Sequence, residues 1–356
     1  MSQRRFILLL AAALVAVALA FFFSSRRHLA RDTQGMLLFP TLADAVNGVS
    51  AVTITKGAPA PSVTVHRSGD RWTVAERADY PADVAKLRKL LLALSEARIV
   101  EEKTSIAANY PAIGVADPGQ AEGAGTRIAV TAPHETDTVI IGKPIGGGNF
   151  VRPGSGPTTY TVEPSLSFET DPRYWIDSTL VDVPATAIAS VAVKIGGDEY
   201  RLHRTTAAGF VFETATPKGR AALDAASLTP PSTALANLTA DDVAAASSVD
   251  FGTASTAVFT LNDGDTLSLA GAAAGDKRWI TVARSKDPAL GTKTAGHAYA
   301  IPQYRYDEIF RPLEQLLAPK SGAKPVAPPK PGPSPHATHA PASSPGARAL
   351  PAKPPV

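Results

Sequence analysis

Short segments in which hydrophobic and polar residues alternate recur through the middle of the chain. Residues 63–67 and 71–74 show this period of two on either side of a Ser-Gly-Asp stretch, and residues 259–269 show it around 262–265. A period of two is typical of half-buried strands, and the Gly-containing stretches between them predict tight hairpins. The pattern therefore predicts antiparallel sheet.

A helical period occupies residues 80–104. Asp83 is a predicted N-cap, because a side-chain oxygen there can accept from the first free backbone N–H groups. Hydrophobic residues then recur on one face, at Val84, Leu87, Leu90, Leu91 and Leu94. The stretch is predicted to be a helix that covers the apolar face of the sheet. Residues 232–246 are predicted to hold the equivalent place later in the chain.

The middle of the chain also repeats itself. Four segments of the first half resemble four segments of the second half, in the same order. The pairs are 49–54 with 188–193, 62–74 with 199–212, 126–142 with 255–271, and 158–166 with 297–305. His66 and Arg67 recur as His203 and Arg204, Trp72 is matched by Phe210, and Tyr160 is matched by Tyr299. Repetition of this kind is typical of two copies of one supersecondary unit. We therefore expect an α+β fold in two tandem β-rich repeats, residues 48–178 and 179–318.

The N-terminus is predicted to be a transmembrane anchor. Residues 1–5 are a basic start, residues 6–23 are apolar without a charge, and residues 24–47 are a connector. Eighteen helical residues span about 27 Å, near the short limit for crossing a bilayer. A cleaved signal peptide is the alternative, because small residues at 18–20 suit a cleavage site. A short basic-led segment favours a single-pass protein of the bacterial inner membrane, with the bulk of the chain periplasmic.

The C-terminus has a different composition. Residues 319–356 contain 12 prolines and five Lys or Arg without an acid, which predicts a disordered, proline-rich tail. Residues 1–31 hold five more basic residues, so the middle keeps 35 − 10 = 25 basic residues against 32 acidic ones, a net charge of −7. An acidic folded region argues against a nucleic-acid partner. The chain has no cysteine, which excludes disulfides and cysteine-ligated metal.

Several short motifs resemble functional sites without meeting their requirements. The loop of residues 142–150 has Lys143 before its glycines, whereas a phosphate-binding loop needs the reverse order. Residues 262–265 lack the frame of a calcium loop and are predicted to be a turn. His66 and His203 are interpreted as packing or edge residues of a repeated strand. The charged run of Glu101, Glu102 and Lys103 is interpreted as solvated. No catalytic, cofactor-binding or metal-binding residue is predicted.

Several blocks together resemble the bacterial domain-of-unknown-function 4340 family. They lie in fixed order between residues 36 and 318 and read LLFPTL (37–42), VSAVTI (49–54), W-x-V (72–74), the helix with its EEKT end (80–104), YPAIGVADP (110–118), IIGK (140–143), FVRP (150–153) and DPRYWID (171–177). The chain departs from the family in having Ile113 where leucine is usual, and in its proline tail. The resemblance implies one membrane segment, a β-rich outer region, and association with ABC-type transport components of the Gld gliding-motility kind. It carries over no catalytic residue.

The expected function is therefore that of a non-catalytic, membrane-anchored accessory or scaffold protein, with ABC permease or ATPase subunits as partners. The alternative is a module that binds a cell-envelope polymer through the groove between the repeats and the basic tail. A third class, an envelope hydrolase, requires convergent acidic or nucleophilic residues that the sequence does not present.

Overall fold

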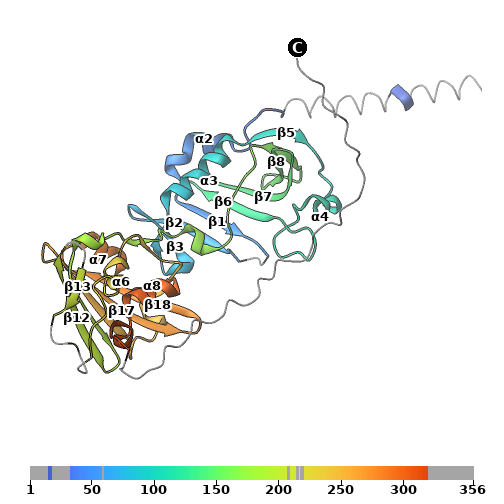
Figure 1. Ribbon diagram of the computed structural model, residues 1–356. Helices are drawn as coiled ribbons and strands as arrows, with labels where there is room; N and C mark the ends of the chain where they lie inside the picture. The colour runs from blue at the N-terminus through green and yellow to red at the C-terminus, as the bar shows by residue number, and fades with distance from the viewer. Residues whose placement is uncertain are drawn as a thin grey trace, which may run out of the picture. The chain divides into compact units, whose positions relative to one another are not determined.

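The computed structural model describes residues 15–17, 33–57, 60–206, 209–213, 216 and 220–319. It confirms a β-rich fold of antiparallel sheets with some helices (Figure 1). The predicted membrane segment, apart from residues 15–17, and the proline-rich stretch beyond residue 319 lie outside the described residues. In the part that is described, no helix combines the length and the hydropathy needed to cross a membrane.

The first sheet has nine strands, all antiparallel to their neighbours. In spatial order they are β4 (Tyr80–Pro81), β3 (Arg71–Val74), β2 (Val63–Ser68), β1 (Ala51–Thr55), β6 (Thr126–Thr131), β7 (Thr136–Ile145), β8 (Gly148–Pro153), β9 (Tyr160–Glu163) and β5 (Arg98–Glu102). The hairpin predicted at residues 63–74 is β2–β3, and the glycine-rich residues 142–150 belong to a second hairpin, β7–β8. Gly69 has a φ of 62° in the first of these turns, a conformation that favours glycine.

The second sheet has eight strands. In spatial order they are β13 (Gly209–Phe212), β12 (Asp198–Thr206), β11 (Ile188–Ile195), β16 (Ser255–Leu261), β17 (Thr266–Ala274), β18 (Lys277–Arg284), β19 (His297–Ile301) and β15 (Asp242–Ala245). The predicted hairpin around residues 262–265 is β16–β17. A separate two-stranded ladder joins β10 (Thr179–Val181) to β14 (Leu238–Thr239).

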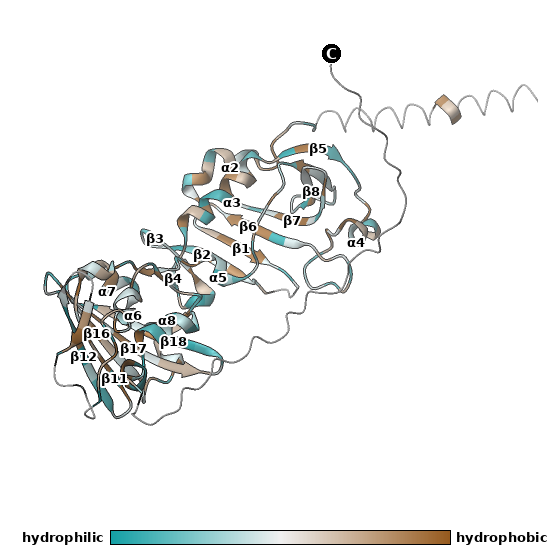
Figure 2. Cartoon of the chain, viewed as in Figure 1, coloured by the Kyte–Doolittle hydropathy of each residue, from teal (hydrophilic) through white to brown (hydrophobic). Residues whose placement is uncertain are grey.

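The described helices are short, with one exception. The α-helices after residue 33 are α2 (Pro40–Ala45), α3 (Val84–Glu96), α4 (Tyr110–Ile113), α5 (Pro172–Trp175), α6 (Pro230–Thr233), α7 (Pro288–Thr294) and α8 (Gln303–Ile309). Described 3₁₀ helices are η1 (Val46–Gly48), η2 (Ala75–Arg77), η3 (Ala107–Asn109), η4 (Ala185–Ala187), η6 (Ala246–Ser248) and η7 (Leu313–Leu316). Hydrophobic segments recur along the strands of both sheets (Figure 2), and most of the buried side chains form one connected core. Two smaller clusters are separate from it, one around Ile140 and one around Trp279.

Helix α3 forms where the sequence predicts it. The Asp83 carboxylate accepts from the backbone N–H groups of Ala85 and Lys86, at 3.0 and 3.1 Å, and so caps the helix. Four of the five predicted face residues are buried, namely Leu87, Leu90, Leu91 and Leu94. The fifth prediction is wrong, because Val84 is 42% exposed. Val84 is the first residue of the helix, where the chain is only beginning to turn onto the sheet.

The helix predicted for residues 232–246 is largely absent. Helix α6 ends at Thr233, and Asn237 adopts a φ of 49°, which breaks any helical path. Strand β15 then pairs with β19, in register from Asp242 opposite Ala300 to Ala245 opposite His297. Backbone pairing at the edge of a sheet has therefore overridden a local pattern that suits a helix equally well.

A different segment covers the second sheet. Phe310, at the end of α8, packs directly on Gly271 of β17, where a Cβ atom would lie 2.3 Å from the phenyl ring. Gly271 is therefore required by a close approach of a side chain rather than by a turn. Ile309, Leu313 and Leu316 extend this buried cover.

The β16–β17 turn contains a buried carboxylate. Asp265 is 2% exposed, and it accepts from the Ser285 hydroxyl at 2.7 Å and from the Arg284 Nε at 2.7 Å. Two backbone N–H groups, of Thr266 and Lys286, donate to the same carboxylate. The Ser285 hydrogen bond, with Arg284 and the backbone donors, lowers the pKa of Asp265 from 3.8 to about 2.

Asp265 is expected to make stability depend on pH in the acidic range. Because its pKa is lower in the folded chain than in the unfolded chain, its contribution is complete above the ordinary value of 3.8. That contribution is lost as the pH falls toward about 2. Thermal melts between pH 5 and pH 2 should show a smaller acid-induced decrease for Asp265→Asn than for wild type. Asp276→Asn, in the exposed β17–β18 turn, is the control and should follow wild type.

Candidate functional site

A polar network among the described residues joins the two sheets. It begins on the short segment between β3 and β4, where η2 is followed by Ala78 and Asp79 with φ values of 55° and 54°. Two successive non-glycine residues in the left-handed region are uncommon and strained. This backbone path turns the chain from η2 into β4, and so places Arg77 and Tyr80 against residues of the second sheet.

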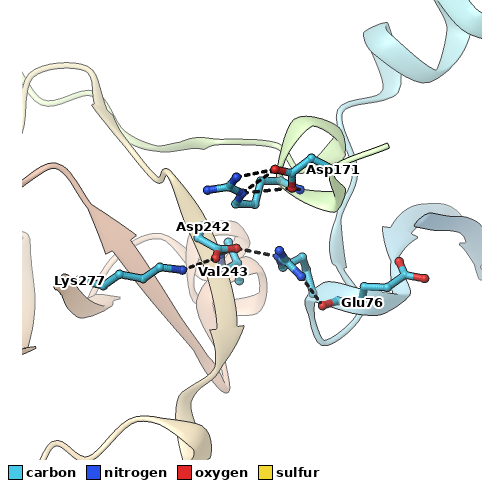
Figure 3. Close-up of polar contacts among 7 residues, drawn as sticks. Glu76, Asp171, Asp242, Val243 and Lys277 are labelled. Atoms are coloured by element: carbon cyan, nitrogen blue, oxygen red, sulfur yellow. Dashed lines mark hydrogen bonds and ion pairs between the residues drawn. The ribbon is translucent and has the colours of Figure 1, made fainter. Parts of the chain in front are cut away.

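Asp242 is the centre of the network (Figure 3). Its Oδ1 atom accepts from Arg77 Nε at 2.6 Å and from the backbone N–H of Val243 at 2.9 Å. Its Oδ2 atom accepts from Lys277 Nζ at 2.8 Å. The Asp242 side chain is only 10% exposed, and Arg77 also donates to the backbone carbonyl of Glu76. Each oxygen of the buried carboxylate thus accepts from a cation, Arg77 of η2 beside the first sheet and Lys277 of β18 in the second sheet.

An aromatic cluster lies beside these charges. Tyr80 packs edge-on against His297 and Tyr299, with ring centroids 5.2 and 5.6 Å apart. Tyr80 and Tyr299 are fully buried. Burial raises the pKa of both tyrosines above the ordinary value, so they stay protonated. His297 Nε2 lies 3.0 Å from the carbonyl oxygen of Ala78, which makes this nitrogen the donor to the strained turn.

A second ion pair completes the junction. Lys293, from α7, places its Nζ atom 2.5 Å from Asp177 Oδ2 and 2.6 Å from the carbonyl oxygen of Thr179. The same ammonium lies 5.8 Å from the centre of the Tyr80 ring. The backbone N–H of Asp177 donates to Pro81 of β4 at 2.9 Å, which ties this pair to the first sheet.

Asp171 lies near the same network (Figure 3). The Asp171 carboxylate caps α5 through the backbone N–H of Arg173, and it also pairs with the Arg173 guanidinium. The Arg173 hydrogen bond lowers the pKa of Asp171.

The residues that join the two sheets are together called the junction. They are Arg77, Tyr80, Asp177, Asp242, Lys277, Lys293, His297 and Tyr299.

The chemistry of the junction is structural. A general base needs a free oxygen or nitrogen toward a substrate, whereas both Asp242 oxygens already accept hydrogen bonds. The buried tyrosines hold their protons, and Lys293 donates to two oxygens. The arrangement can therefore hold the two sheets in one relative orientation.

The sequence candidates are placed elsewhere in the fold. Glu101 and Glu102 lie on the edge strand β5, and Glu101 pairs with Lys103 at 2.6 Å. The loop of residues 142–150 is the β7–β8 turn, and Lys143 Nζ donates to the carbonyl of Ala112 at 2.8 Å. Among the residues described, no group of three or more potential metal ligands is brought together.

The two repeated histidines occupy matching positions in the two sheets. His66 pairs with Ala51 across β1–β2, and His203 pairs with Ser190 across β11–β12. His66 Nε2 lies 3.4 Å from Asp79 Oδ1 in the strained turn, whereas His203 Nδ1 is buried without a hydrogen-bond partner. The structure does not bring the two histidines to one site.

Sequence reasoning missed the junction. Arg77 and Asp242 are 165 residues apart, and each stands in a locally unremarkable stretch. The one available signal was the repeat itself, because it marked Tyr299 as the counterpart of Tyr160. Nothing in the sequence indicated that Tyr299 would pack against Tyr80.

Comparison with known proteins gives one match. The sequence model of one family, described as "Domain of unknown function (DUF4340)", matches residues 72–255. The matched range begins at Trp72 and includes both Arg77 and Asp242 of the junction. No protein of curated function matches the chain, and no solved structure matches it.

Proposed function

The chain belongs to the DUF4340 family, and from this premise we propose that it is a non-catalytic accessory or scaffold protein of a membrane transport complex. The proposal places the chain in the bacterial inner membrane through residues 6–23, with the sheets on the periplasmic side. Its partners would be the permease or ATPase subunits of an ABC-type system of the Gld kind. The observation that carries the scaffold role is the junction.

The junction supports a scaffold role because it would restrict the motion of one sheet relative to the other. Two sheets joined by a linker alone would move independently, since interfaces within a chain resemble transient protein interfaces. Here a buried carboxylate with cations from both sides and a fully buried tyrosine pair hold the sheets together. A scaffold needs such a fixed orientation, because surfaces on the two sheets must reach the partner together.

The proposal includes the origin of the two sheets as tandem copies of one unit. When β1 is aligned with β11, the remaining strands of the two sheets correspond one to one. The spatial order of the strands is then the same in both sheets, except that the first sheet has the additional strand β4. The registers agree as well. Arg67 faces Trp72 as Arg204 faces Phe210, and Val151 faces Tyr160 as Ile280 faces Tyr299. Duplication would supply two similar surfaces, which a scaffold can present to two parts of one partner.

The test is affinity capture of the full-length chain, gently solubilised from its own membrane, with identification of co-purifying proteins by mass spectrometry. The expected result is stoichiometric recovery of an ABC permease or ATPase, reduced for Asp242→Ala at equal expression. Recovery without either subunit would overturn the transport role. Retention on peptidoglycan or envelope polysaccharide, lost on deleting residues 319–356, would instead support a polymer-binding module.

A further inference from the structure

A small groove lies between helix α3 and the β2–β3 hairpin. Its volume is 240 Å³, and its apolar part is formed by Val49, Leu87, Leu91 and Trp72. Two arginines line its rim, Arg67 from β2 and Arg88 from α3. The groove is separate from the junction, with which it shares no residue.

Both rim arginines are exposed and uncommitted. In the part of the chain that the structure describes, neither Arg67 nor Arg88 has a side-chain hydrogen bond or an ion pair. The counterpart of Arg67 in the second sheet behaves differently. Arg204 donates to the carbonyl of Ile188 at 3.0 Å and stacks on Phe210 at 4.5 Å. The equivalent arginines therefore differ. Arg204 contacts its own sheet, whereas the Arg67 guanidinium has no partner among the described residues.

The apolar side of the groove continues onto the surface. Val84, Arg88 and Leu92 are spaced four residues apart, so they form one row along α3. Val84 is 42% exposed and Leu92 is 53% exposed. Tryptophan and arginine are the residues most enriched among energetically dominant interface positions. Here one Trp, two Arg and the exposed Val84 line one groove, and the exposed Leu92 follows Arg88 one turn along α3.

We propose that this groove binds a peptide segment of a partner protein in which an acidic residue lies next to a large apolar residue. The volume of 240 Å³ is below the roughly 300–1,000 Å³ usual for small-molecule sites, and it suits an anchoring side chain. The acidic residue of the proposed peptide is inferred from charge complementarity, because each of the two unpaired guanidinium groups can pair with a carboxylate.

The setting of the groove strengthens the electrostatic argument. Residues 32–318 carry 25 basic and 32 acidic side chains, so the net charge of this region is −7 and its overall sign is unfavourable to an acidic partner. In an acidic region, the unpaired side chains of Arg67 and Arg88 direct an acidic segment to this groove. The inference concerns the groove alone and does not depend on the transport role.

The test is selection of random 12-residue peptides on the detergent-solubilised full-length chain, followed by affinity measurement with fluorescently labelled selected peptides. Counter-selection uses the Arg67→Glu/Arg88→Glu variant. Peptides retained only by wild type should contain Asp or Glu adjacent to Leu, Ile, Phe or Trp. Each single charge reversal should weaken their binding by tenfold or more, about 1.4 kcal/mol.

The matched control is Arg71→Glu, which makes the same charge change on the same hairpin outside the groove and should alter affinity less than twofold. An unchanged thermal midpoint establishes that each variant is folded. Selected peptides without acidic residues, or equal binding to wild type and the double variant, would overturn the proposal. So would arginine-dependent binding to phosphatidylglycerol vesicles in the absence of any such peptide, which would assign the groove to a lipid surface.

Discussion

Tyr80→Ala is expected to lower the free energy of unfolding by about 4 kcal/mol, the largest single effect in the junction. Tyr80 is fully buried, and its ring contacts His297 and Tyr299. Removing the ring leaves a cavity between the two sheets, and both contacts across it are lost. Chemical denaturation followed by circular dichroism measures the change.

Tyr304→Ala is the matched control, because Tyr304 is 60% exposed and should cost less than about 1 kcal/mol. Tyr80→Phe retains the ring and should remain within about 1 kcal/mol of wild type. A loss below about 1 kcal/mol for Tyr80→Ala would mean that the two sheets do not depend on this contact, and the scaffold argument would then fail.

Asp242→Ala is expected to cost about 3 kcal/mol, because it leaves Arg77 and Lys277 without their shared carboxylate. The Asp242 side chain is 10% exposed, so water cannot fully replace the lost partner. The neighbouring exposed residue provides the control, and Asp241→Ala should change stability by less than about 0.5 kcal/mol. Denaturant titration of both variants measures the difference.

A double-mutant cycle measures the interaction between Arg77 and Asp242 apart from their other contacts. Arg77→Ala, Asp242→Ala and the double variant should show a coupling of about 1 kcal/mol or more, since residues in one ion-pair network do not act additively. Hydrogen exchange at β4 and β15 should accelerate together in Asp242→Ala. Additive effects, with exchange confined to β15, would show that the pair does not connect the two sheets.

Local features of the fold could be predicted from the sequence, because their causes lie within a few residues. Asp83 caps α3 through N–H groups two and three residues away. Gly69 lies in the turn that closes the β2–β3 hairpin. Leu87 and Leu91 are buried because a helix of this periodicity has one apolar face. The antiparallel, β-rich class followed from the same short-range patterns.

Residues 232–246 mark the limit of such reasoning. Their composition suits a helix, but the edge of β19 was available for backbone pairing, and β15 forms there. Val84 makes the same point on a smaller scale. It has the right spacing for the buried face and remains exposed, because it begins the helix at the rim of a groove.

The turns, the capped helix and the alternating strands follow from the sequence alone, since each depends on neighbours along the chain. The repeated blocks and the acidic charge of the middle region can be read from it directly. The junction and the groove exist only in the folded chain. Arg77 pairs with Asp242, 165 residues away, and Arg67 of a hairpin lines one groove with Arg88 of a helix. The physical reason is that charge and hydrophobicity are properties of single residues, whereas pairing and exposure depend on which surfaces the packed elements bring together.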